Sequence, residues 1–202
     1  MKKSSKLPVL EGIEVKNVGS LPVFAAFCRR MNLQDTLNKL LPGNMQVDPG
    51  TMIQAMMLDT LSGRTPLYRL SEFIETVDTD VLLGRDISPG NFNDTTLGRV
   101  LDMIYDYGAG KLFSRLAFSV LQQFPLDIHH VHFDTTSVNV WGNYEEDNDE
   151  SIDVTYGHSK DKRPDLKQFM IKMLCAKRNI PILGQCIDGN SSDQNVNNQL
   201  LS

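Results

Sequence analysis

Hydrophobic residues recur every three or four positions through the first 125 residues, and proline or glycine separates one run from the next. This spacing places the apolar side chains on one face of a helix. Asp48-Pro49-Gly50 before the run at 51–61 and Gly63 after it are typical helix boundary residues. The pattern predicts helices over 21–28, 33–41, 49–62 and 66–77, a helix capped by Asp94 or Thr95, and a last one over 111–123.

The pattern changes after Pro125 to short runs that are rich in β-branched residues. The runs at 128–140, 168–176 and 180–187 have strand length, and Arg178-Asn179 predicts a tight turn between the last two. We therefore expect three antiparallel strands, followed by the start of a helix near Ser192. The predicted fold class is α+β, with a helical domain over 1–125 and an incomplete α/β domain of three antiparallel strands over 126–202. Three strands joined by hairpins leave sheet surface uncovered, so we expect this second domain to be cut short.

The composition is that of a globular protein. The chain has 202 residues, of which 41% are hydrophobic and 22% charged, and these values exclude a wholly disordered chain. Three cysteines are too few for a disulfide scaffold. No apolar run is long enough for a membrane helix and the first residues lack a secretory signal, so we expect a cytoplasmic protein with no membrane partner.

Charge is unevenly distributed between the two halves. Residues 1–125 contain 13 basic and 13 acidic residues, whereas residues 126–202 contain 7 and 12. Four cations of the second half nevertheless cluster at Lys160, Lys162, Arg163 and Lys167. A local basic stripe can hold DNA phosphates even on an acidic chain, and the alternative is a solvated surface loop.

Asp134 is the strongest local candidate for chemistry, because it lies inside an apolar predicted strand and precedes Thr135-Thr136-Ser137. A carboxylate in a buried strand costs several kcal/mol unless it is paired, hydrogen-bonded or holding a cation. Oxygen ligands of this kind suit Mg²⁺ or Mn²⁺. The alternative is an aspartate that accepts hydrogen bonds from nearby backbone amides.

Other reactive residues give weaker signals. His129, His130 and His132 lie on one predicted strand, but their spacing to the cysteines matches no zinc motif. Cys175 and Cys186 lie in the predicted hairpin, where we expect them to be close together and inert. Trp141 is expected to be partly buried in the core, with stacking on a displaced base as the alternative.

Three stretches of the second half together resemble insertion-sequence transposases with an RNase H-like catalytic domain. They are HFDTTSVNVWGNYE, YGHSKDKRPDLKQF and RNIPILGQCIDGNSSDQNVNNQLL. The first half, from Ile13 to about Phe124, resembles the helical N-terminal domain of unassigned function that precedes the catalytic domain in one branch of these transposases. The resemblance covers essentially the whole chain.

The resemblance implies a metal-dependent DNA transposase in which two Asp and one Glu hold two divalent metals. Asp134 matches the first Asp, while the positions of the second Asp and of the Glu are not present in this chain. We therefore expect a chain that is inactive alone, with Mg²⁺ or Mn²⁺ weakly bound or absent. Expected partners are transposon-end DNA and either full-length transposase or a second copy. The alternatives are a non-enzymatic DNA-binding or inhibitory fragment and a metal-dependent nuclease of related fold.

Overall fold

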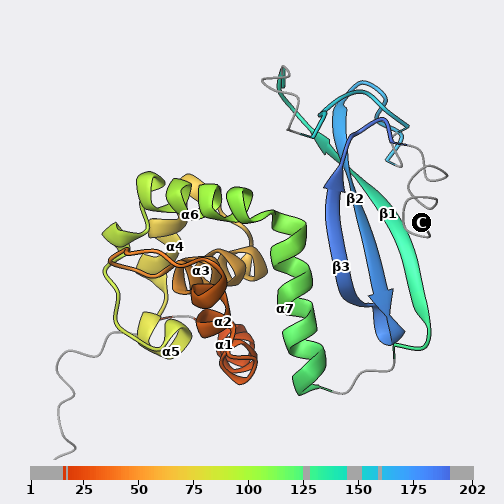
Figure 1. Ribbon diagram of the computed structural model, residues 1–202. Helices are drawn as coiled ribbons and strands as arrows, with labels where there is room; N and C mark the ends of the chain where they lie inside the picture. Colours follow the sequence, from red (N-terminus) through yellow and green to blue (C-terminus); the bar gives the residue numbers. More distant parts are fainter. Residues whose placement is uncertain (1–15, 17, 125–127, 145–151, 159–160, 192–202) are drawn as a thin grey trace, which may run out of the picture. The chain divides into compact units, whose positions relative to one another are not determined.

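The structure is a computed structural model that describes residues 16, 18–124, 128–144, 152–158 and 161–191, with the side chain of Arg178 excepted (Figure 1). Helices occupy its N-terminal part and an antiparallel sheet follows, so the predicted α+β class is confirmed. The α-helices are α1 (Leu21–Arg30), α2 (Leu33–Leu40), α3 (Pro49–Ser62), α4 (Leu70–Thr76), α5 (Thr79–Leu83), α6 (Asp94–Tyr107) and α7 (Ala109–Gln123). Short 3₁₀ turns are η1 (Leu67–Arg69), η2 (Pro89–Asn91) and η3 (Lys177–Asn179).

The chain divides into two compact units. The helical unit comprises Met1–Asn38 and Pro42–Val100, and the sheet unit comprises Lys39–Leu41 and Leu101–Ser202. This division differs from the expected boundary at residue 125, because α7 is grouped with the strands. None of the described helices is long and apolar enough to cross a membrane.

The core of the helical unit forms where α1 packs against α3 and α5, and where α4 packs against α3 and η2. Apolar residues at helical spacing supply it, as the pattern predicted. Its fully or almost fully buried members include Ala25, Leu37, Met52, Leu58, Leu70, Leu82, Phe92, Leu97 and Val100.

The helix boundaries follow from local capping chemistry. The Asp48 side chain accepts a hydrogen bond from the Thr51 backbone N–H at the start of α3, and Pro49 follows in the first turn. At α6 the cap is Asn93, whose Oδ1 accepts the Thr96 N–H at 3.1 Å. The expectation of a cap at Asp94 or Thr95 was therefore one or two residues too late.

The short helix α5 was not predicted. Asp78 caps its start by accepting from the Val81 N–H, and Gly84 with φ of 84° ends it. Its last carbonyls accept hydrogen bonds from side chains of three other helices, so tertiary contacts rather than helical periodicity hold it. The three donors are Arg29 to Val81 at 3.0 Å, Gln54 to Leu82 at 2.8 Å and Gln34 to Leu83 at 3.0 Å.

The three predicted strands form one antiparallel sheet in the order β1-β2-β3. The predicted turn between β2 and β3 is the 3₁₀ turn η3, in which Asn179 takes a positive φ of 57°. The expected helix near Ser192 lies outside the described residues. The strands are β1 (Val131–Val140), β2 (Lys167–Ala176) and β3 (Ile180–Ile187).

Helix α7 packs against β3 within the sheet unit. A Cβ at Gly184 would lie 3.5 Å from the Phe113 ring, and one at Gly110 would lie 3.1 Å from the Gly184 carbonyl oxygen. Glycine at both positions therefore lets the helix backbone approach the strand closely.

Candidate functional site

Asp134 lies in the middle of β1 on an exposed part of the sheet, opposite Met173 of β2. Its Oδ1 accepts the backbone N–H of Thr135 at 2.8 Å. Thr135 and Ser137 are buried and lie on the other face, because side chains alternate along a strand. Of the three hydroxyl residues that follow Asp134, only Thr136 shares its face.

The described residues do not by themselves fit a two-metal site. Across the strand pair, the Asp134 face carries the apolar Met173 and Ile171. Within the described ranges, no group of three or more His, Cys, Asp or Glu side chains could hold a metal ion. A pair of divalent cations needs several carboxylate oxygens, and Asp134 alone cannot supply them.

The histidines and cysteines do not form a reactive cluster in the part of the chain that the structure describes. His129, His130 and His132 are all exposed. Cys175 lies opposite Pro181, whereas Cys186 lies opposite Ile171 at the other end of the hairpin. The expectation that the two thiols lie close together was therefore wrong, because the strand register separates them by several residues.

The predicted basic segment lies where β2 begins, and its cations are placed differently. Lys160 lies outside the described residues, and Lys162 is exposed with a positive φ of 58°. Arg163 forms an ion pair with Asp165, in which the arginine Nε donates to Oδ1 at 2.8 Å and the arginine Nη2 donates to Oδ2 at 2.7 Å. Hydrogen bonding and charge from Arg163 hold the pKa of the Asp165 carboxyl below its usual value.

Lys167 binds the backbone of the loop that follows β1. Its Nζ donates to the backbone carbonyls of Asn143 at 2.6 Å and Tyr144 at 2.8 Å, just after β1. A second polar contact lies nearby: Asn139, near the end of β1, donates to the carboxylate of Asp161, which precedes β2, at 2.8 Å. The first residue of β2 is thus bound to the segment after β1, and the end of β1 is bound to the segment before β2.

Trp141 lies in this loop region and is 72% exposed. The expectation of partial burial was wrong, since Trp141 follows Val140, whose pairing with Lys167 is the last of the β1–β2 ladder. The Arg163 guanidinium carbon lies 5.9 Å from the centre of the indole ring, which is cation–π distance. Sequence reasoning missed this contact; its signal is a lone tryptophan directly after a strand, next to Gly142.

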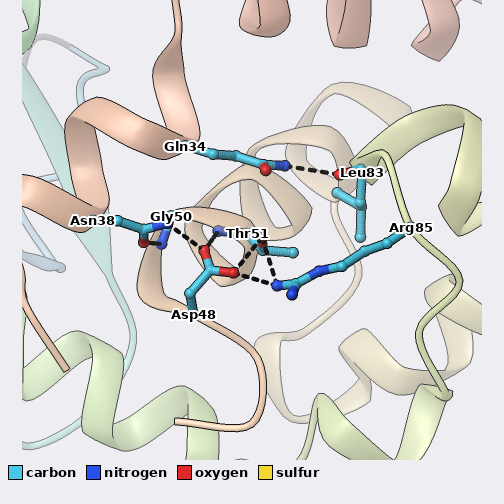
Figure 2. Close-up of polar contacts among 7 residues, drawn as sticks. All are labelled: Gln34, Asn38, Asp48, Gly50, Thr51, Leu83 and Arg85. Atoms are coloured by element: carbon cyan, nitrogen blue, oxygen red, sulfur yellow. Dashed lines mark hydrogen bonds and ion pairs between the residues drawn. The ribbon is translucent and has the colours of Figure 1, made fainter. Parts of the chain in front are cut away.

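A second polar cluster, at the start of α3 in the helical unit, was also missed (Figure 2). The Asp48 carboxylate accepts from the side chains of Asn38 and Thr51 at 2.8 and 3.0 Å, and it forms an ion pair with Arg85. Burial alone would raise the pKa of Asp48, but these hydrogen bonds, the Thr51 N–H and the Arg85 charge together lower it. The signal in the sequence was the Asp-Pro-Gly helix start; the partner Arg85 lies 37 residues away.

Comparison with known proteins places the chain in a family. The family model described as "Domain of unknown function (DUF4277)" matches residues 13–118, which is just over half of the chain. No curated protein and no solved structure matches. The matched region extends from before α1 into α7. The chain belongs to the DUF4277 family.

Proposed function

We propose that this chain acts in DNA transposition, with Asp134 as the first metal-binding carboxylate of an RNase H-like catalytic domain. One observation carries the proposal. Asp134 is an exposed carboxylate in the middle of a ten-residue strand of an antiparallel sheet, within the DTTS sequence that resembles the transposase motif. An exposed position lets a carboxylate reach a metal or DNA without the cost of burial.

The activity of the chain alone is expected to be DNA binding without strand cleavage. Among the described residues of β2, those on the Asp134 face are the apolar Met173 and Ile171, and neither can bind a cation beside Asp134. We infer that Mg²⁺ or Mn²⁺ binds productively only when a full-length transposase contributes the remaining carboxylates. When bound, such metals stabilise an in-line displacement at phosphorus.

The helical unit is proposed to bind transposon-end DNA or to serve in assembly. Several cations of the helical unit already have partners within the fold: Arg69 pairs with Glu72 at 2.5 Å and Arg29 donates to the Val81 carbonyl. Lys111 lies 4.9 Å from the centre of the Tyr107 ring. An assembly role is therefore tested alongside DNA binding.

A non-enzymatic inhibitor of transposition is the second candidate, favoured by the apolar Met173 and Ile171 on the Asp134 face of the sheet. In this role the chain would occupy transposon ends or join a full-length transposase without completing its active site. The two candidates differ in whether Asp134 matters once the missing carboxylates are supplied.

The test is a nicking assay on plasmid carrying a transposon end, with Mg²⁺ or Mn²⁺. The chain alone is expected to bind the DNA, and so to change its gel mobility, without nicking it. Fusion to a segment with an Asp-bearing strand and a Glu-bearing helix is expected to give metal-dependent nicking that Asp134→Asn abolishes. Asp102→Asn, at an exposed aspartate of α6, is the matched control and should leave nicking unchanged.

Two results would count against the proposal. Nicking by the 202-residue chain that survives Asp134→Asn would refute the catalytic assignment. Failure of the chain to bind any DNA would refute the transposition proposal and would leave only an inhibitor that joins a full-length transposase.

A further inference from the structure

Trp141 is exposed, and polar contacts of Arg163, Asp165 and Lys167 surround it. The Asp165 carboxylate accepts two hydrogen bonds from the Arg163 guanidinium, and this guanidinium lies over the Trp141 ring. A planar guanidinium that a carboxylate holds at Nε and at one terminal nitrogen is well suited to lie over an aromatic ring. Arg163 therefore restrains Trp141 from one face.

The backbone beside Trp141 is fixed as well. Gly142 and Tyr144 take positive φ angles of 146° and 35°, which turn the chain sharply after β1. Lys167 holds the carbonyls of Asn143 and Tyr144 in that turn. Arg163 and Lys167, which sequence reasoning assigned to phosphate binding, thus build the support for an exposed aromatic ring.

We propose that Trp141 is a stacking platform for an unpaired nucleobase of DNA. The inference rests on the proposed function in DNA transposition and names a binding site within it. An indole ring with a guanidinium on one face has its second face to offer to a flat ligand. Every nucleobase has a π-face, so such stacking tolerates any sequence and requires only that the base is unpaired.

The surroundings of Trp141 favour a nucleobase over a protein partner. The Arg163 guanidinium over the ring and the exposed Lys162 place cationic groups beside Trp141, which suits a ligand that carries a phosphate. Lys162 is exposed and adjacent to Arg163 in the chain, where it can meet the phosphate of the stacked nucleotide. In this arrangement Arg163 is a positioning residue and Lys162 is the phosphate contact.

Trp141 is the only tryptophan in the sequence, so the intrinsic tryptophan fluorescence of the whole chain reports on this ring alone. The experiment titrates the full chain with a single-stranded thymidine oligonucleotide and, separately, with a blunt duplex. The single strand is expected to quench the fluorescence, because a stacked base contacts the ring. The duplex is expected to bind with little quenching.

Variants separate stacking from general binding. Trp141→Ala is expected to weaken single-strand affinity by roughly tenfold and to leave duplex affinity unchanged. Trp141→Phe should retain most of the single-strand affinity. Tyr68→Ala is the matched control, because Tyr68 of the helical unit is 67% exposed, and it should change neither affinity. Arg163→Gln should lower the fluorescence anisotropy of free Trp141 and weaken single-strand binding.

The outcomes distinguish this inference from the proposed function. Binding of both DNA forms without quenching, or with an unchanged affinity in Trp141→Ala, overturns the stacking platform and leaves the transposition proposal standing. No binding of either form overturns both. Loss of self-association in Trp141→Ala with intact single-strand binding would instead assign Trp141 to a protein interface.

Discussion

Gly50 lies at the start of α3, so close to α2 that a side chain has no room there. A Cβ at this position would lie 2.8 Å from both the Gln34 Cα and the Asn38 Oδ1. The Gly50 N–H also donates to Asn38 Oδ1 at 2.7 Å, so the backbone cannot move away without losing this bond. The position therefore requires glycine because of the neighbouring backbone rather than because of its own φ.

Gly50→Ala is expected to destabilise the helical unit by about 2 kcal/mol, because overpacking displaces the α2–α3 contact. Gly98→Ala in α6 is the matched control: a Cβ there meets no described atom within 4 Å. That control should stabilise α6 by up to about 1 kcal/mol, since alanine favours helix. Urea denaturation followed by circular dichroism measures both. Equal effects would contradict the close approach.

Asp48 gives the helical unit a pH-dependent stability. Its pKa is lowered in the folded state, so it stabilises the fold above the unfolded value of about 3.9, and this contribution is lost as the pH falls through the folded pKa. The stability difference between wild type and Asp48→Asn is therefore expected to be largest near pH 7 and to shrink below about pH 4. Asp48→Ala, which also removes the cap, should cost about 1–2 kcal/mol at pH 7. A difference that stays constant down to pH 2.5 (on the order of one pH unit below the unfolded value) would contradict the assignment.

Individual residues show which features of the structure could be predicted from the sequence and which could not. Asp48-Pro49-Gly50 identified a helix start, because capping depends on residues three or four positions apart. The Arg85 partner of Asp48 and the tight packing of Gly50 depend on distant segments, and neither was predicted. The basic segment shows the same division: its cations were identified, but the partners of Arg163 and Lys167 depend on the fold.

At the level of elements, α5 depends on the side chains that cap its C-terminus. Gln54 is 1% exposed and donates to the Leu82 carbonyl. Gln54→Met keeps a similar volume but removes the donor, so it is expected to destabilise the helical unit by about 1–3 kcal/mol. Gln34→Met, at the half-buried donor to Leu83, is the control and should cost less. Hydrogen exchange of the α5 amides should speed up most in Gln54→Met; unchanged exchange would show that other contacts hold α5.

Most elements were predicted well, and the shortest α-helix, α5, was not. Helices α1 to α4, α6 and α7 have apolar stripes, and the strands are mostly apolar runs of strand length, so their positions followed from the sequence. The five residues of α5 are too few to show a helical period. The expectation about Cys175 and Cys186 was wrong for another reason: in an antiparallel hairpin Cys175 lies next to the turn and Cys186 lies far from it, opposite Ile171.

For the whole molecule, the net charge of −5 makes DNA binding a matter of local cations. Affinity for DNA is expected to fall steeply between 50 and 200 mM salt (about the range over which phosphate contacts are screened), because binding releases counterions. Lys162→Gln should reduce the slope of log affinity against log salt by about one. Lys39→Gln, at an exposed lysine outside the basic segment, should leave the slope unchanged. A salt-independent affinity would exclude phosphate contacts as the source of binding.

The way in which α5 is capped also constrains how the helical unit folds. A five-residue helix is unstable alone, so α5 can form only after α1, α2 and α3 have brought Arg29, Gln34 and Gln54 to its C-terminus. These hydrogen bonds are then absent from the folding transition state. Weakening them leaves the folding rate nearly unchanged and accelerates unfolding. The contacts that cap α5 are therefore expected to affect the unfolding rate of the helical unit more than its folding rate.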